Sequence, residues 1–156
     1  MVESLGDQRA VVRADWPQPA VVSEPQVLAD DSILSLMYRT ADDRYAVVRF
    51  PLCIYFAFGA PNDEALGGHP LARAGLQHYS VHEVHGSTLI SELERRNSVH
   101  PRHDRASHLS RRHFVFTFHD STLECVVPAE EWWIPTVALY HQAEVAEAAW
   151  RATKHA

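Results

Sequence analysis

The chain has few of the cysteines that form disulfides in small secreted domains, and it lacks the long apolar run of a membrane-spanning helix. Its 156 residues include only two cysteines, Cys53 and Cys125, and both lie in apolar runs where a buried, reduced thiol is expected. The longest apolar run, from Pro51 to Ala60, has about ten residues, whereas a spanning helix needs about twenty. Near the N-terminus Glu3 stands where a signal peptide would carry positive charge. We therefore expect a cytoplasmic protein without membrane contact.

The sequence motifs that mark common catalytic sites are missing as well. The chain has neither of the glycine-rich patterns, G-x-x-x-x-G-K and G-x-G-x-x-G, that cradle phosphates. It also lacks H-E-x-x-H, C-x-x-C and the H-x-H pair of cupin-type barrels. No G-x-S-x-G motif occurs, and neither cysteine has the electropositive, exposed setting that a nucleophile requires. Catalysis through a covalent intermediate is therefore not expected.

Positive charge comes almost entirely from arginine and is unevenly distributed. Lys154 is the single lysine, a preference that an arginine-rich composition from a GC-rich bacterial genome would explain. The net charge is −6, yet residues 95–113 hold six arginines and one acid. An acidic protein thus carries one basic segment. Nucleic-acid binding is not expected, because binders carry a broad basic face and no aromatic residue lies between Arg95 and Arg112.

Histidine is concentrated in the same part of the chain. Nine of the eleven histidines fall between His69 and His119. The unperturbed pKa of histidine lies nearest neutral pH, and arginine is the preferred partner of carboxylates and phosphates. The segment that holds both is therefore where a functional site is expected.

Alternating apolar and polar residues predict a mostly antiparallel sheet. The expected strands are residues 33–39, 45–50, 52–58, 78–85, 113–119 and 122–127. Residues 52–58 are almost entirely apolar, which is typical of a strand buried on both faces. The predicted fold class is α+β, with one sheet of five to seven strands, a terminal helix packed on it and one short inserted helix. Closure of the sheet into a barrel is an open alternative.

Two helices complete the predicted fold. Ser87 is expected to cap the inserted helix, which ends at Asn97, and Thr136 is expected to cap the terminal helix. The docking face of the terminal helix would consist of Leu139, Ala143, Ala146 and Trp150. Prolines predict an extended lead-in over residues 1–26, and residues 27–156 are predicted to form a single globular domain.

The clearest local signal is a hairpin within residues 113–127. Placing Asp120 and Ser121 in a two-residue turn pairs His119 with Thr122 and gives each strand two consistent faces. The face expected in the core is Phe114, Phe116, Phe118, Leu123, Cys125 and Val127. The opposite face is His113, Val115, Thr117, His119, Thr122, Glu124 and Val126. Because this second face mixes apolar and titratable residues, it is the candidate site.

The mixed face suggests proton transfer. The predicted catalytic residues are His113, His119 and Glu124. The predicted substrate-binding residues are Arg102, Arg111, Arg112 and Thr117. Glu124 would lie diagonal to His119 and orient its imidazole, while the long loop over residues 98–112 would bring guanidinium groups to a carboxylate or phosphate. The sequence thus predicts a small cytosolic bacterial enzyme that performs histidine acid/base chemistry on an anionic small molecule, with no cofactor and no covalent intermediate.

Several alternatives stay open at the level of sequence. The chain can instead be a non-catalytic binding module whose Arg/His loop contacts an acidic partner, with the sheet histidines as ordinary polar residues. It can also be a metal-dependent enzyme, and the ligands of a divalent ion would then be His100, His103 and His108. The surrounding arginines disfavour a dication there. Asp63 and Glu64, in a glycine-flanked loop, form either a second carboxylate pair or ordinary turn acids. A homodimer surface can form from Trp132, Trp133 and Trp150.

Overall fold

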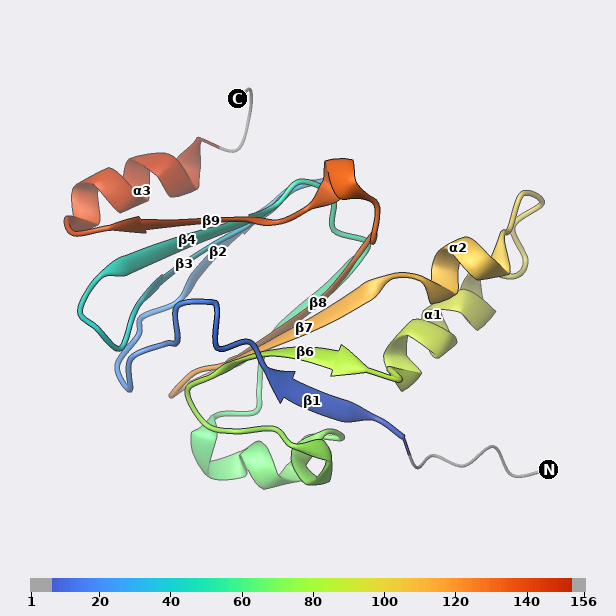
Figure 1. The fold of residues 1–156 in the computed structure, drawn as a ribbon, viewed down its shortest axis with the longest axis horizontal. Coiled ribbons are helices and arrows are strands. Elements are labelled where there is room, and N and C mark those ends of the chain that lie inside the picture. Colours follow the sequence, from blue (N-terminus) through green and yellow to red (C-terminus); the bar gives the residue numbers. More distant parts are fainter. Residues whose placement is uncertain (1–6, 153–156) are drawn as a thin grey trace.

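The structure, a computed structural model that describes residues 7–152, contains two antiparallel sheets that face each other (Figure 1). In spatial order, the five-stranded sheet comprises β1 (Arg9–Val12), β6 (Val81–His85), β7 (Arg112–Thr117), β8 (Thr122–Val127) and β5 (Tyr55–Gly59). The four-stranded sheet comprises β2 (Gln26–Ala29), β3 (Leu34–Arg39), β4 (Tyr45–Phe50) and β9 (Thr136–Tyr140). The α+β class is confirmed, but the strands form two layers rather than the one sheet that the sequence predicts.

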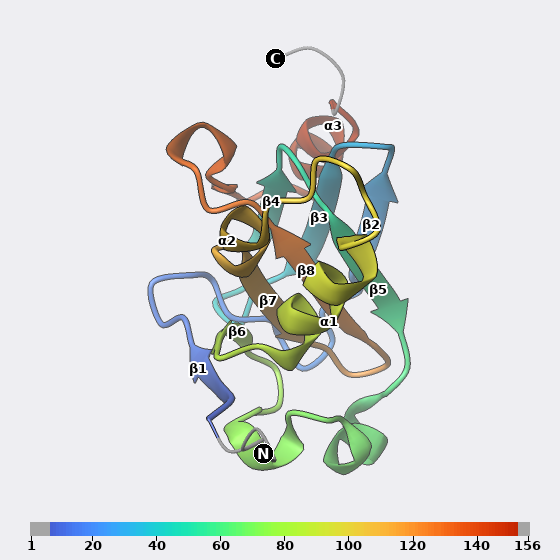
Figure 2. The same cartoon turned by 90° about the vertical axis from the view of Figure 1, so that its right-hand side faces the viewer.

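In the described part of the chain, six short helices surround the two sheets. The α-helices are α1 (Thr88–Asn97), α2 (Arg105–Leu109) and α3 (Ala143–Arg151), and the 3-10 helices are η1 (Asp63–Gly68), η2 (Ala72–Ala74) and η3 (Glu131–Trp133). Helices α1 and α2 form a lobe at one end, and Figure 2 shows this lobe in front of strands β6 to β8. As predicted, Ser87 caps α1 by accepting a hydrogen bond from the amide of Ile90. None of the helices in residues 7–152 is long and apolar enough to cross a membrane.

The main core lies between the two sheets and is rich in aromatic rings. Phe116 of β7 is fully buried, and its ring contacts those of Trp16, Tyr38, Phe50 and Phe118 at centroid distances of 6.0 to 6.3 Å. The core side chains of β7 and β8 occupy alternate positions, because successive residues of a strand point to opposite faces. The core face predicted for this hairpin is therefore confirmed. Its other face is left free to carry polar residues.

Helix α3 packs on the outer face of the four-stranded sheet. Ala146 and Trp150 are buried there against Met37 and Val47, as predicted. The other two residues of the predicted docking face are not part of it, because Ala143 is exposed and Leu139 lies in β9. The Trp150 indole donates to the carbonyl of Ser35 at 3.0 Å, so the polar atom of the ring is satisfied on burial. The helix starts later than predicted, however, because residues 136–140 form strand β9 instead of its first turns.

One further expectation about the strands is wrong. The apolar segment at residues 52–58 is not buried on both faces, since β5 is an edge strand and Phe56 and Phe58 are 40% and 42% exposed. Of the N-terminal lead-in predicted over residues 1–26, residues 1–6 lie outside the described residues, and the described part contributes to the sheet and the core. Its residues 9–12 form β1 at the other edge of the same sheet, and Trp16 enters the core. In both cases the arrangement of neighbouring strands, rather than local composition, sets the burial.

Gly75 follows η2 in a backbone conformation that a side chain would strain. Its φ angle is +111°, and a Cβ atom at this position would lie 2.6 Å from the carbonyl oxygen of Ala10 in β1. We expect Gly75→Ala to lower the free energy of unfolding by about 2 kcal/mol, as measured by urea denaturation. Gly67→Ala is the matched control, because that site has open space, and it should change stability by less than about 0.5 kcal/mol. Equal effects of the two substitutions would contradict this account.

Candidate functional site

The hairpin of β7 and β8 has the predicted faces but a shifted turn. Thr117, not His119, pairs with Thr122, and the amide of Phe118 donates to the carbonyl of Ser121 at 2.9 Å. The two turn residues are therefore His119 and Asp120. The register differs from the prediction by two residues, and a shift of two leaves every side chain of a strand on its original face. His119, however, now lies in the turn and not on the sheet face.

Glu124 of β8 lies on the outer face of the five-stranded sheet between two histidines. Nε2 of His113 is 2.8 Å from one carboxylate oxygen, and Nε2 of His69 is 3.1 Å from the other. The amide of Leu71 donates to Nδ1 of His69, so the Nε2 of that ring carries the proton and donates to Glu124. Burial raises the pKa of Glu124, but the hydrogen bonds from His113 and His69 outweigh it and lower this pKa to about 2.

Ser87 extends this arrangement into a continuous hydrogen-bonded chain. Its Oγ lies 2.8 Å from Nδ1 of His113, the ring nitrogen that does not face Glu124. Ser87 already accepts a hydrogen bond from the amide of Ile90, so its hydroxyl proton is free to be donated to His113. Ser87, His113 and Glu124 thus stand in series from the start of α1 through β7 to β8. Such a series is the arrangement in which a carboxylate orients an imidazole toward a hydroxyl.

A cavity of about 430 Å³ lies between the start of α1, the end of β6 and the start of β7. Ser87, Arg111 and Arg112 all line it. The side chain of Arg111 is partly buried and makes no hydrogen bond or ion pair with any residue in the range 7–152. Its burial lowers the pKa of the guanidinium, and the charge of Glu130 opposes this. The cavity therefore contains a cationic group that the protein itself does not neutralise by contact.

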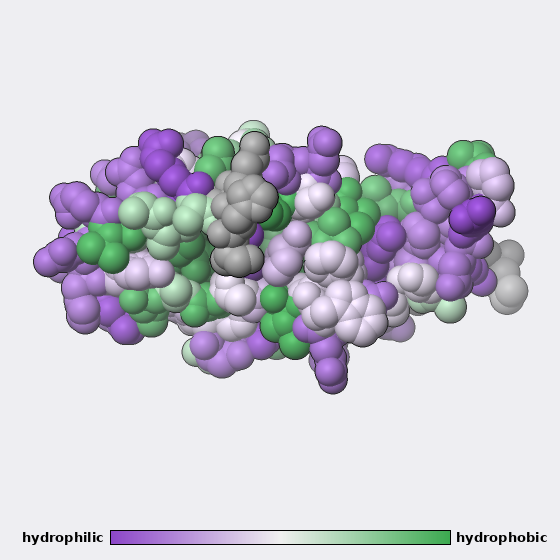
Figure 3. Space-filling view, turned by 90° about the horizontal axis from the view of Figure 1, so that it is seen from above, coloured by the Kyte–Doolittle hydropathy of each residue, from purple (hydrophilic) through white to green (hydrophobic). Residues whose placement is uncertain are grey.

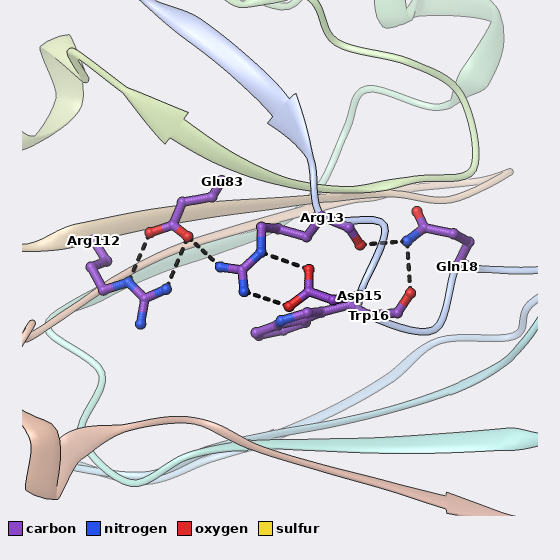
Figure 4. A network of polar contacts seen from close by, with 6 residues as sticks. All are labelled: Arg13, Asp15, Trp16, Gln18, Glu83 and Arg112. Atoms are coloured by element: carbon purple, nitrogen blue, oxygen red, sulfur yellow. Dashed lines mark hydrogen bonds and ion pairs between the residues drawn. The ribbon is translucent and has the colours of Figure 1, made fainter.

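Arg112 is held differently, by a network drawn in Figure 4. Its Nε and Nη2 lie 2.7 and 2.9 Å from the two carboxylate oxygens of Glu83, and Arg13 approaches the same carboxylate at 2.5 Å (Figure 4). Burial raises the pKa of Glu83, but the two arginines outweigh this and lower it. Arg13 also pairs with Asp15. The two arginines and the two carboxylates cancel in formal charge, and Glu83 itself lines the cavity, so the uncompensated positive charge there is that of Arg111.

The other side of the Glu124 cluster opens onto a smaller cavity of opposite character. Its volume is about 180 Å³, and it is lined by Glu124, His69 and His113 together with Tyr55 and Glu92. Two carboxylates and no arginine or lysine line it. An anionic ligand is disfavoured there by charge repulsion. The cavity at Arg111 and Arg112 is therefore the one that fits an anion.

His119 does not contact Glu124, and the predicted pairing of the two is wrong. Its Nδ1 lies 2.7 Å from the carboxylate of Asp63, which also accepts a hydrogen bond from the hydroxyl of Tyr79 at 2.6 Å. The bond from Tyr79 is the main cause that lowers the pKa of Asp63, with His119 adding to it against burial. The imidazole is half exposed. The displaced turn explains the difference, because a turn residue is not held on the sheet face that bears Glu124.

Thr117 and Arg102, the other predicted substrate-binding residues, do not reach this cavity. The hydroxyl of Thr117 is buried and donates to the carbonyl of Gln77 at 2.6 Å, while it accepts from the amide of Ser80 at 3.0 Å. Arg102 is exposed on the segment between α1 and α2 and is not among the residues that line the cavity. Of the four predicted binding residues, the structure therefore brings two to one cavity.

The three histidines considered as metal ligands have other partners. His103 bonds to Glu94 at 2.9 Å, Nδ1 of His108 donates to the carbonyl of Asp104 at 2.8 Å, and His100 accepts from the amide of Arg102. Within residues 7–152, no group of three or more His, Cys, Asp or Glu side chains is arranged to hold a metal ion. The loop expected over residues 98–112 also contains helix α2, which Asp104 caps.

Sequence reasoning missed the roles of His69 and Ser87 in this site. His69 lies in an irregular segment between η1 and η2, where no periodic pattern shows which way a side chain points. Ser87 is identified in the sequence as a helix cap, but its contact with His113 joins positions 26 residues apart. No family model, curated protein or solved structure matches this chain.

Proposed function

We propose that this protein is an enzyme that performs acid/base chemistry on a small anionic molecule bound beside Ser87, Arg111 and Arg112. One observation carries the proposal. The cavity lined by Arg111 and Arg112 is also lined by Ser87, whose hydroxyl is hydrogen-bonded to His113 and through it to Glu124. Two predicted anion-binding residues and two predicted catalytic residues thus belong to one connected site.

Arg111 supports the anionic nature of the ligand. A partly buried guanidinium has lost part of its hydration, and without a counterion it is energetically costly. A carboxylate or phosphate in the cavity would restore charge-assisted hydrogen bonds to Arg111. A cavity of about 430 Å³ is within the usual size for small-molecule sites.

The hydrogen bonds of His113 support the acid/base chemistry of the proposed enzyme. The carboxylate of Glu124 fixes the ring by accepting its Nε2 proton, which leaves Nδ1 as the basic nitrogen facing Ser87. The low pKa of Glu124, about 2, keeps it ionised at neutral pH, so it stabilises the imidazolium that forms when Nδ1 takes a proton. Glu124 is thus a positioning residue, and His113 exchanges protons with the cavity through the hydroxyl of Ser87.

A binding module is the second candidate, because the α1–α2 lobe presents exposed positive charge. The exposed arginines of the lobe are Arg95, Arg96, Arg102 and Arg105. Arg96 pairs with Glu92, whereas Arg95 and Arg102 form no side-chain hydrogen bond or ion pair within residues 7–152. The lobe end of the molecule is mainly hydrophilic in the view of Figure 3. An acidic partner would contact these arginines and would leave the cavity unused.

A chromogenic ester assay separates the two candidates. We expect faster hydrolysis of mono-p-nitrophenyl succinate, which carries a carboxylate, than of neutral p-nitrophenyl butyrate. Arg111→Gln should lower kcat/KM for the anionic ester about tenfold, as loss of one charge-assisted interaction predicts. His113→Gln should lower it about a hundredfold or more, as loss of a general base predicts.

Arg102→Gln is the control for the assay, because Arg102 is an exposed arginine outside the cavity. It should leave kcat/KM within about twofold, which is the range expected for a surface charge away from the site. Thermal melts establish that each variant is folded. Rates that are equal for the two esters, or that are unaffected by Arg111→Gln in folded protein, would rule out the proposed enzyme.

A further inference from the structure

Ser87 occupies a strand-turn-helix junction between β6 and α1. Gly86 makes the turn with a φ of +67°, and a Cβ atom there would lie 2.7 Å from the carbonyl oxygen of Asp7. Only glycine fits this turn without strain. Ser87 is then fixed as the cap of a ten-residue helix, with its Oγ directed to His113. The position of the hydroxyl is thus set by backbone and side chain together.

The chain of hydrogen bonds also shows how His113 can act. The residue is 2% exposed, and both ring nitrogens are occupied, one by Glu124 and the other by Ser87. In the free protein the hydroxyl of Ser87 therefore lies between the cavity and Nδ1 of His113. Ser87 is the member of the chain that lines the cavity with Arg111 and Arg112. The first proton that His113 removes during the reaction therefore comes from the hydroxyl of Ser87.

We infer that Ser87 is the nucleophile of this site and that its substrates are esters of small dicarboxylic acids. The inference rests on the proposed function and makes it more specific. The free carboxylate of the acyl group would lie against Arg111, and the ester carbonyl would lie beside Oγ of Ser87. A guanidinium binds a carboxylate through two parallel hydrogen bonds, which would fix the acyl group in one orientation. The covalent step departs from the sequence-based expectation of a mechanism without a covalent intermediate.

The reaction has two balanced halves. In the first, the bond between Oγ of Ser87 and the acyl carbon forms, and the bond from that carbon to the alcohol oxygen breaks. The proton of Oγ passes to Nδ1 of His113 and then to the departing alcohol. In the second half the acylated Oγ has no proton to donate, so Nδ1 of His113 can accept one from a water molecule that attacks the acyl carbon. The bond to Oγ then breaks as that proton passes from His113 to Ser87. The products are the alcohol and the dicarboxylic acid, whose new carboxyl group releases its proton to water.

Negative charge develops on the carbonyl oxygen in both halves. The helix dipole and Arg111 supply positive potential beside it, whereas Arg112 is paired with Glu83. Ser87 is at the N-terminus of α1, where the helix dipole is positive. Arg111 lines the same cavity. These groups are in place before the reaction begins, which is the condition under which they stabilise a transition state more than a ground state.

The test is to trap the acyl group on Ser87. The full chain is mixed with mono-p-nitrophenyl succinate, quenched in acid within the first turnover, and examined by intact mass and peptide mapping. We expect one succinyl group, located on Ser87. Ser87→Asn should lose the adduct and reduce hydrolysis to the background rate. Asn keeps a side-chain oxygen that caps a helix, so the fold is retained. Succinate titration followed by NMR should show binding by this variant within about twofold of the unchanged protein.

The possible outcomes distinguish this inference from the proposed function. Hydrolysis that needs Arg111 and His113, but persists in Ser87→Asn with no adduct on Ser87, overturns the nucleophile and leaves the acid/base enzyme in place. Wild-type hydrolysis at the background rate, with no adduct and no succinate binding, overturns both. An adduct on a residue other than Ser87 also contradicts the inference.

Discussion

Glu124→Gln is expected to lower the free energy of unfolding by about 3 kcal/mol at pH 7. This value corresponds to the difference between the pKa of Glu124 in the unfolded chain, 4.5, and its pKa of about 2 in the folded protein. The carboxylate accepts an N–H from His113 and another from His69. A glutamine side chain has one oxygen and one NH₂ group, so it can accept from only one of the two rings. The other imidazole N–H then faces a donor inside the protein.

The same substitution should change the pH dependence of stability. Because the folded pKa of Glu124 is depressed, its contribution is present above about pH 4.5 and is lost as the pH falls toward 2. The Glu124→Gln variant has no carboxylate at this position that could bind a proton. Its stability curve, measured by urea denaturation from pH 7 to pH 2, should therefore fall less steeply than that of the unchanged protein in this window. The remaining fall comes from other ion-paired acids such as Asp63 and Glu83.

Glu92→Gln is the control for this prediction. Glu92 lines the same small cavity but is exposed, and it pairs with Arg96 on the surface of α1. Surface pairs contribute little, so we expect a change of less than about 1 kcal/mol and a pH dependence like that of the unchanged protein. If the stability curves of Glu124→Gln and the unchanged protein are parallel, the hydrogen bonds from the two histidines to Glu124 do not contribute to the pH dependence of stability, and the prediction is wrong.

Phe116→Ala is expected to destabilise the protein by about 3 to 5 kcal/mol, the range for removing a fully buried aromatic side chain. Phe116 is 0% exposed and contacts rings from both sheets, including Tyr38 and Phe50 of the four-stranded sheet and Phe118 beyond the end of β7. Truncation leaves a cavity at the centre of the interface between the layers. The measurement is the unfolding midpoint and slope in urea.

Phe58→Ala provides the comparison within the same residue type. Phe58 is on the edge strand β5 and is 42% exposed, so its truncation removes less buried area and leaves no enclosed cavity. We expect a loss of about 1 kcal/mol or less. If the two substitutions cost the same, the interior between the sheets is not the packed core that the structure describes.

Local sequence patterns predicted a large part of the fold because they depend only on neighbouring residues. The hairpin of β3 and β4 has the expected strands, and Ser87 caps α1 as its type and position indicate. The two faces of β7 and β8 follow from strict alternation. The turn between them does not, since His119, Asp120 and Ser121 all suit turns and a shift of two residues preserves both faces.

The strand β9 shows why periodicity can mislead at the end of a chain. Leu139 lies four residues before Ala143, and this spacing also suits a helix that continues to Trp150. In the structure Thr136–Tyr140 pairs with β4 instead. An open strand edge offers hydrogen-bond partners to a nearby segment, and that pairing outweighs a weak helical preference.

The sequence by itself determined that this chain is an α+β protein, that one face of residues 113–127 is apolar, and that histidine and arginine concentrate between His69 and His119. These properties follow from composition and from the period of a strand. Only the tertiary structure decided which of these side chains meet. It paired Glu124 with His69 and His113 rather than His119, and it placed Ser87 in one cavity with Arg111. Such contacts join distant segments, and they depend on how loops and sheet ends pack, which no local pattern encodes.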